Sequence, residues 1–143
     1  MKWVTRERVH VDRVACPWLI KRFIDPDAVF EFVPRDTDPS TITDGIPFDF
    51  KGVELGHHGD KCSFDAFMEK YKLDDPALKK IQQIVREADT HVENPSPLAI
   101  ALKILARGYS MISKDDHETL EKEFPLYDAL YAYFKNELEN ESK

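Results

Sequence analysis

The character of the sequence changes near residue 63, and this change limits the folds that the chain can adopt. Before it, short apolar pieces are separated by Pro, Gly and Asp, which is typical of short strands and turns. After it, apolar residues recur at three and four positions, which is typical of amphipathic helices. We therefore predict one α/β (or α+β) domain over residues 1–143, with a small mixed sheet from the N-terminal half packed against four or five helices, mostly from the C-terminal half.

The N-terminal half contains several strand candidates and one helix. KWVTRE (2–7) indicates a short strand, and AVFEFVP (28–34) alternates on the strand period. Two further short strand candidates are IPFDF (46–50) and GVELG (52–56). Residues 16–24 fit a helix with Pro17 in the first helical position, because proline is tolerated there and an apolar stripe follows it.

The C-terminal half predicts a series of helices. One covers residues 63–71 with Ser63 as its cap, and a second covers 75–88. SPLAIALKILA (96–106) is apolar nearly all round, so we expect this helix in the centre of the core. A further helix covers 113–124, and Pro125 is expected to break it and to start another.

Charge and composition exclude several classes of function. The net charge of −7 and a pI near 5.2, without a cluster of Lys and Arg, argue against nucleic-acid binding. There is no transmembrane-length apolar stretch and no signal-peptide segment, so we expect a cytoplasmic protein without membrane contact, in which Cys16 and Cys62 are free thiols. No glycine-rich phosphate loop is present, so no nucleotide cofactor is expected.

A first group of chemically active side chains lies at a predicted strand-to-helix turn and consists of Arg6, Asp12, Arg13, Cys16 and Arg22. The free N–H groups at a helix start favour anions, and the same field lowers the pKa of a thiol placed there. An oxyanion site with a reactive cysteine is one interpretation. In the other, Cys16 is a small buried hydrophobe and the arginines pair with acidic neighbours.

A second group lies in and beside LGHHGDKCSFDAF (55–67), where Glu54, His57 and Cys62 combine a carboxylate, an imidazole and a thiol. These groups are competent ligands for a divalent transition metal, but their spacing matches no established zinc pattern. The alternative is a polar loop whose histidines bond to the backbone.

Asp89 and His117 lie at predicted helix ends, where charged side chains ordinarily complement the helix dipole. They become candidates only if the fold brings them beside Glu54 and His57.

Four blocks of the chain resemble the chromate-resistance protein family, in the domain that forms the C-terminal part of ChrB-type proteins. They are WVTRERVHVDRVACPWLIKRFIDP, VELGHHGDKCSFDAF, IVREADT and DDHETLEKEFPLYDALYAY. The resemblance places at characteristic positions Arg6, Asp12, Arg13, Cys16, Pro17, Trp18, Arg22, Asp25, Glu54, His57, Cys62, Phe64, Asp65, Asp89, His117, Asp128 and Tyr131. It also favours His57 over His58 as a site residue.

The resemblance implies a stress-response role in chromate sensing or detoxification. Longer relatives are described as chromate-sensing regulators and carry an additional N-terminal region. A domain with a charge of −7 is not expected to be the DNA-binding part, so the regulator role is not transferred whole.

Residues and resemblance together leave three hypotheses. In the first, Arg6, Asp12, Arg13 and Arg22 bind a small oxyanion such as chromate, because guanidinium groups present paired donors to oxyanions. Arg13, Cys16 and Cys62 would then carry the chemistry, since thiolates are the oxidisable form of cysteine.

In the second hypothesis, Glu54, His57 and Asp89 hold a divalent ion (zinc, iron, manganese or nickel), and Cys62 or His117 completes the ligand set. The domain would then be a small metal-dependent enzyme, or the metal would itself bind the oxyanion. In the third, it is a non-catalytic interaction domain whose last helix offers aromatic side chains to a homodimer. The sequence leaves open whether the protein is an enzyme.

Overall fold

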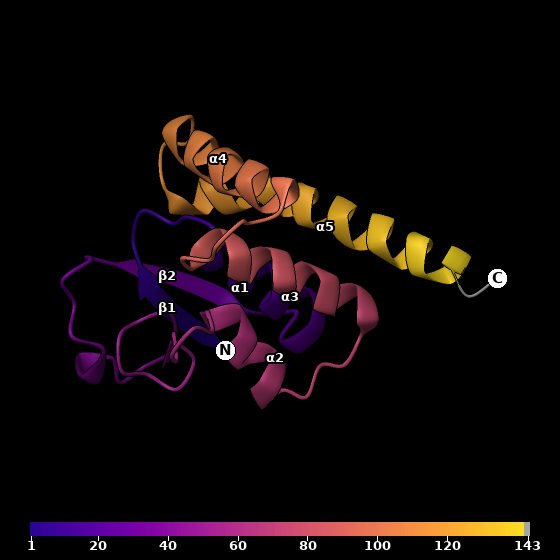
Figure 1. The fold of residues 1–143 in the computed structure, drawn as a ribbon. Coiled ribbons are helices and arrows are strands. Elements are labelled where there is room, and N and C mark those ends of the chain that lie inside the picture. The colour runs from indigo at the N-terminus through magenta and orange to yellow at the C-terminus, as the bar shows by residue number, and fades with distance from the viewer. Residues whose placement is uncertain (142–143) are drawn as a thin grey trace.

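In the computed structural model, which describes residues 1–141, helices pack on a small sheet (Figure 1). Strand β1 (Lys2–Arg6) is central, with β2 (Val29–Val33) on one side and β3 (Ile46–Pro47) on the other. Both strand pairs are parallel, and Val4 lies opposite Glu31 and Pro47. The α/β class is confirmed, although the sheet is parallel where a mixed one was predicted. Parallel neighbours require a crossover, and helix α1 (Asp12–Leu19) supplies the one between β1 and β2.

Helix α1 begins at Asp12, earlier than the predicted start at residue 16, and Pro17 therefore lies inside it. The reason is that the Val11 carbonyl accepts hydrogen bonds from the N–H groups of Val14 (3.2 Å) and Ala15 (2.8 Å), which starts the helix upstream. A short π-helix, Ile20–Ile24, continues the chain.

Residues 52–56 form turns and not the predicted strand. Backbone with positive φ at Asp49 and Gly52 reverses the chain direction, and the Asp49 N–H then donates to the Leu55 carbonyl at 2.8 Å. Gly56 lies against this reversal so closely that a Cβ there would be 2.6 Å from the Phe50 carbonyl oxygen. A short 3-10 helix (Pro39–Thr41) lies in the connection between β2 and β3.

Helices α2 (Ser63–Lys70) and α3 (Pro76–Asp89) agree closely with the predicted ranges. The cap of α2 is Cys62 and not Ser63, because the Asp65 carboxylate reaches back to the Cys62 N–H at 2.9 Å. Asp65 also accepts hydrogen bonds from Gln82 and Arg86 of α3, so one carboxylate joins the two helices.

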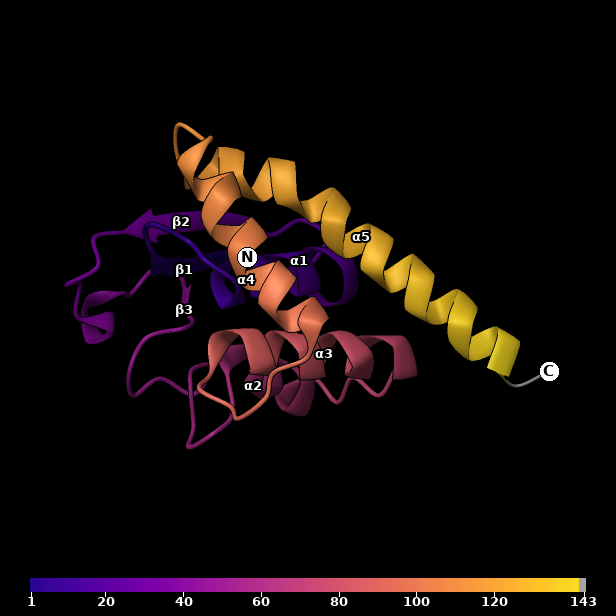
Figure 2. The ribbon, with the colours of Figure 1, turned by 45° about the horizontal axis from the view of Figure 1, so that its top comes forward.

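Helix α4 (Pro97–Met111) is not in the centre of the core, as its apolar sequence predicted. It buries only Ala99, Leu102 and Ala106, because it packs along one side against α3 and α5 (Asp116–Glu141). Its other side faces outward, and no other part of residues 1–141 covers it in Figure 2.

Helix α5 is one continuous helix, so the predicted break at Pro125 is wrong. Leu120 before the proline and Tyr127 after it are both buried in the core, and this packing holds the two halves in line despite the missing hydrogen bond. The C-terminal end of α5 extends past the other elements in both ribbon views (Figures 1 and 2).

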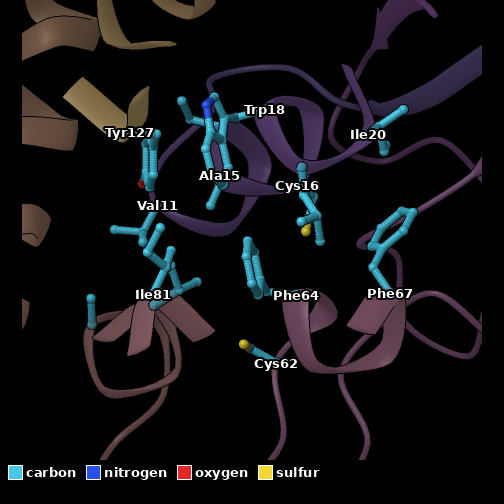
Figure 3. Close-up of a cluster of buried hydrophobic side chains, with 14 of the residues drawn as sticks. Val11, Ala15, Cys16, Trp18, Ile20, Cys62, Phe64, Phe67, Ile81 and Tyr127 are labelled. Carbon is cyan, nitrogen blue, oxygen red and sulfur yellow. The ribbon is translucent and has the colours of Figure 1, made fainter. Parts of the chain in front are cut away.

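The core is rich in aromatic side chains contributed by both halves of the sequence (Figure 3). Trp18 of α1 lies 5.7 Å from Tyr127 of α5 between ring centroids, and Phe64 and Phe67 bring α2 into the same cluster. Among residues 1–141, no helix combines the length and apolar character needed to cross a membrane.

Candidate metal centre

Three carboxylates converge on one nitrogen of His57. Its Nε2 lies 2.9 Å from Asp89 Oδ2, 3.3 Å from Asp12 Oδ2 and 3.3 Å from Asp49 Oδ1. These residues come from separate segments: Asp12 begins α1, Asp49 follows β3, His57 lies in the loop before α2, and Asp89 ends α3. The fold therefore brings together His57 and Asp89, as the second hypothesis required, and adds Asp12 and Asp49.

Asp12 is held in place by the start of α2. Its carboxylate accepts the backbone N–H groups of Ser63 at 2.7 Å and Phe64 at 3.0 Å. These N–H groups have no partner within their own helix, so a residue of α1 caps α2. Asp12 also accepts the Cys16 thiol at 3.3 Å, and its side chain is almost fully buried.

Asp49 is held by a different set of donors. Arg13 Nε lies 3.1 Å from its carboxylate, the Ser63 hydroxyl donates to it at 2.6 Å, and Arg6 Nη2 lies 3.7 Å away. Arg13 also donates through Nη1 to the carbonyls of Arg6 and Glu7. The guanidinium group of Arg13 is thus occupied by contacts within the protein.

The cluster carries more negative than positive charge, and the pKa values reflect this. Hydrogen bonds to Asp12, Asp49 and Asp89 raise the pKa of His57 to about 12. Burial raises the pKa of Asp12 to about 7, which the bond to His57 opposes. Burial also opposes ionisation of Asp49, but His57, Ser63 and Arg13 together hold the pKa of that carboxyl below its usual range.

Asp12, His57 and Asp89 form the one group within residues 1–141 whose ligand atoms are close enough to share a metal ion, all lying within 4.8 Å of one another. Ligands held about 2.1 Å from a metal are separated by roughly 3.0 Å in octahedral and 3.4 Å in tetrahedral geometry. The separations from His57 Nε2, 2.9 Å to Asp89 and 3.3 Å to Asp12, lie close to these values. The donor types and these two separations are compatible with a shared divalent ion.

The cluster is open on the side of His57, whose side chain is 41% exposed. A groove of about 880 Å³ lies between the following loop and α3, and its lining includes Gly59, Thr90 and His91. Gly59 and Thr90 follow His57 and Asp89 closely in the chain, but His57 and Asp89 themselves do not line the groove.

Four predicted site residues lie outside the cluster, namely Glu54, His117, Arg22 and Cys62. The Glu54 carboxylate is 2.9 Å from Lys70 Nζ and is well exposed. His117, at the start of α5, packs its ring against Phe32 at 4.9 Å between centroids. Arg22, in the π-helix after α1, pairs with Asp128 at 3.0 Å.

The two cysteines are buried free thiols. Burial raises the pKa of both Cys16 and Cys62, and neighbouring carboxylates raise it further. Cys16 donates to Asp12, and Cys62 donates to Asp65 at 3.3 Å. Both thiols lie within the apolar cluster around Phe64 (Figure 3), as in the interpretation of Cys16 as a small buried hydrophobe.

Sequence reasoning assigned Asp12 to anion binding and missed Asp49. The signal for Asp49 was its place in FDF, where Phe48 and Phe50 are both buried, because an acidic residue between buried aromatics needs partners inside the protein. The period-two pattern of this segment indicated only a strand.

The sequence model of the family described as "ChrB, C-terminal domain" matches residues 3–134. The chain is also 35% identical over 142 residues to Protein ChrB of Cupriavidus metallidurans. That alignment covers 94% of this chain and 41% of the relative, so the chain spans about two fifths of the relative's length. No solved structure gives a significant match.

Proposed function

The chain belongs to the ChrB C-terminal domain family, and we propose that it acts in chromate resistance as a metal-binding domain, with a divalent ion held by Asp12, His57 and Asp89. The resemblance to the chromate-resistance family is thereby confirmed at the level of the family. The metal and its role are the proposal.

The convergence on His57 Nε2 carries this proposal. The nitrogen has at most one N–H, which can point to one acceptor, yet three carboxylate groups lie within 3.3 Å of it. Two of these carboxylates, on Asp12 and Asp49, are buried, where negative charge must be compensated, and Arg13 compensates Asp49. A divalent cation that replaces the proton on Nε2 would be shared by His57, Asp12 and Asp89.

The ligand types narrow the choice of ion. One imidazole and two carboxylates suit zinc, iron, manganese or nickel, whereas copper(I) prefers sulfur ligands. The Cys62 thiol donates to Asp65, and the His117 ring packs against Phe32, so neither side chain is a further ligand of the ion. The remaining positions on the ion are open to water or to a bound oxyanion.

Arg6 is the best placed donor for such an oxyanion. Its side chain is 31% exposed and its Nη2 lies 3.7 Å from Asp49, while its Nε is buried without a hydrogen-bond partner in the described structure. Arg13, in contrast, pairs with Asp49 and donates to two backbone carbonyls. Arg22 forms an ion pair with Asp128, away from the cluster. Of the three arginines in the oxyanion hypothesis, only Arg6 is therefore proposed to bind an oxyanion beside the metal.

The test is calorimetric titration of the metal-stripped, untagged protein with zinc and manganese. We expect one ion per chain, with affinity reduced more than about 100-fold in His57→Ala because a direct ligand is lost. His58→Ala is the matched control, since the neighbouring imidazole bonds to the Glu54 carbonyl at 2.7 Å and should leave affinity unchanged. Unchanged binding by His57→Ala contradicts the proposed ligand set.

Oxyanion binding is tested by titrating chromate into metal-loaded protein. Arg6→Ala should weaken binding about tenfold, the loss expected for one charged hydrogen bond. Arg22→Ala removes an equal charge at a distant ion pair and should have no effect. Equal effects of the two substitutions would argue against Arg6 as the donor.

A further inference from the structure

We propose that the chain forms a two-fold symmetric dimer through the outward side of α4. We call this surface the α4 face, and its residues are Leu98, Ile100, Ile104, Leu105, Met111 and Ile112. The proposal does not depend on metal binding, because the α4 face contains none of the residues of the metal centre.

The α4 face is unusually apolar for a surface helix. Exposed fractions range from 39% at Leu98 to 80% at Met111, and Ile104 is 65% exposed. Together these side chains expose on the order of 700 Å², above the roughly 300–600 Å² of the largest apolar patch on a typical monomer. Such a surface is characteristic of an interface.

The face combines a ridge with a groove. Ile100 and Ile104 lie one helical turn apart and form the ridge. Beside them, an apolar groove of about 290 Å³ lies between α4 and α5, lined by residues that include Leu102, Leu130 and Tyr133. In a two-fold pair, the ridge of each copy can enter the groove of the other, since the same patch meets itself.

The area of the face favours a second copy as the occupant. A standard interface buries about 800 Å² per partner, which the face and groove together can supply. The charged residues of α4 are Lys103 and Arg107, and within residues 1–141 neither takes part in an ion pair. Two cations on a chain of net charge −7 do not fit an anionic lipid surface.

Sedimentation equilibrium of the chain from about 0.1 to 100 μM, with chelator present, tests the proposal. We expect a concentration-dependent species of twice the 16.6 kDa chain mass. Ile104→Lys should weaken the dimer at least about 100-fold, because a charge replaces an apolar side chain at the interface. Val29→Lys is the matched control, since Val29 is exposed to a similar extent, 62%, on the edge strand β2.

Two results would overturn the dimer. One is a wild-type chain that stays at 16.6 kDa at every concentration. The other is a dimer that Ile104→Lys and Val29→Lys weaken equally, because association would then use another surface. Circular dichroism of both variants establishes that each is folded, and the chelator keeps the result separate from metal binding.

Discussion

Glu123 is a fully buried acidic residue without a hydrogen-bond partner among residues 1–141. It lies on α5, one turn before Tyr127, and both of its carboxylate oxygens lack a hydrogen bond in the described structure. Burial raises the pKa of Glu123 to about 7. The folded state therefore holds a proton that the unfolded chain releases at lower pH, which makes stability depend on pH.

We expect Glu123→Gln to stabilise the protein at pH 8 but not at pH 4.5. As pH rises from about 4.5 to 7, the unfolded state binds fewer protons than the folded state, so the wild type loses roughly 3 kcal/mol that the variant keeps. Urea unfolding of both proteins across this range measures the difference. Glu121→Gln, an exposed change on the same helix, controls for the substitution of glutamate by glutamine. If the difference in unfolding free energy between Glu123→Gln and the wild type did not change with pH, the raised pKa of Glu123 would be contradicted.

At the scale of elements, two glycines have opposite surroundings. Gly56 closes the turn that presents His57, and a Cβ there would lie 2.6 Å from the Phe50 backbone oxygen, which cannot move aside easily. Gly108 lies within α4, where a Cβ would meet nothing within 4 Å. The first glycine is required by packing, and the second lowers the stability of its helix.

Alanine at these positions should therefore change the free energy of unfolding in opposite directions. We expect Gly56→Ala to destabilise by roughly 2 kcal/mol through steric strain. Gly108→Ala should stabilise by about 0.5–1 kcal/mol through helix propensity. Thermal and urea unfolding of the two variants measure this, and a destabilised Gly108→Ala would indicate an unrecognised contact of α4.

At the scale of the whole molecule, the proposed ion would join three parts of the chain, namely α1, α3 and the loop that precedes α2. Metal at a hundred times its dissociation constant should raise the free energy of unfolding by about 2.7 kcal/mol. Amide exchange should slow most in residues 50–61, the part of the site with no regular helix or strand. His57→Ala should show neither effect, and equal stabilisation of this variant would place the ion elsewhere.

The sequence was sufficient for the fold class and, within one residue, for the ends of α3, which follow from local patterns and from the capping chemistry of Asp75. It offered His57 and Asp89 as neighbours in only one of three hypotheses, and the fold brings the two side chains together. The sequence was insufficient where contacts between distant residues decide the course of the chain or the position of a helix. The chain reversal after Asp49 removed a predicted strand, core packing kept α5 straight at Pro125, and α4 lies at the surface although its composition resembles that of a core helix.

The cap that Asp12 provides for α2 has a consequence for the order of events during synthesis. Its partners Ser63 and Phe64 lie 51 and 52 residues further along, and leave the ribosome correspondingly later. Until then the Asp12 carboxylate must stay in water, because burying it without these N–H groups is unfavourable. Residues 1–50 hold all three strands but not this cap, so the nascent sheet must wait for α2 before it can close its core.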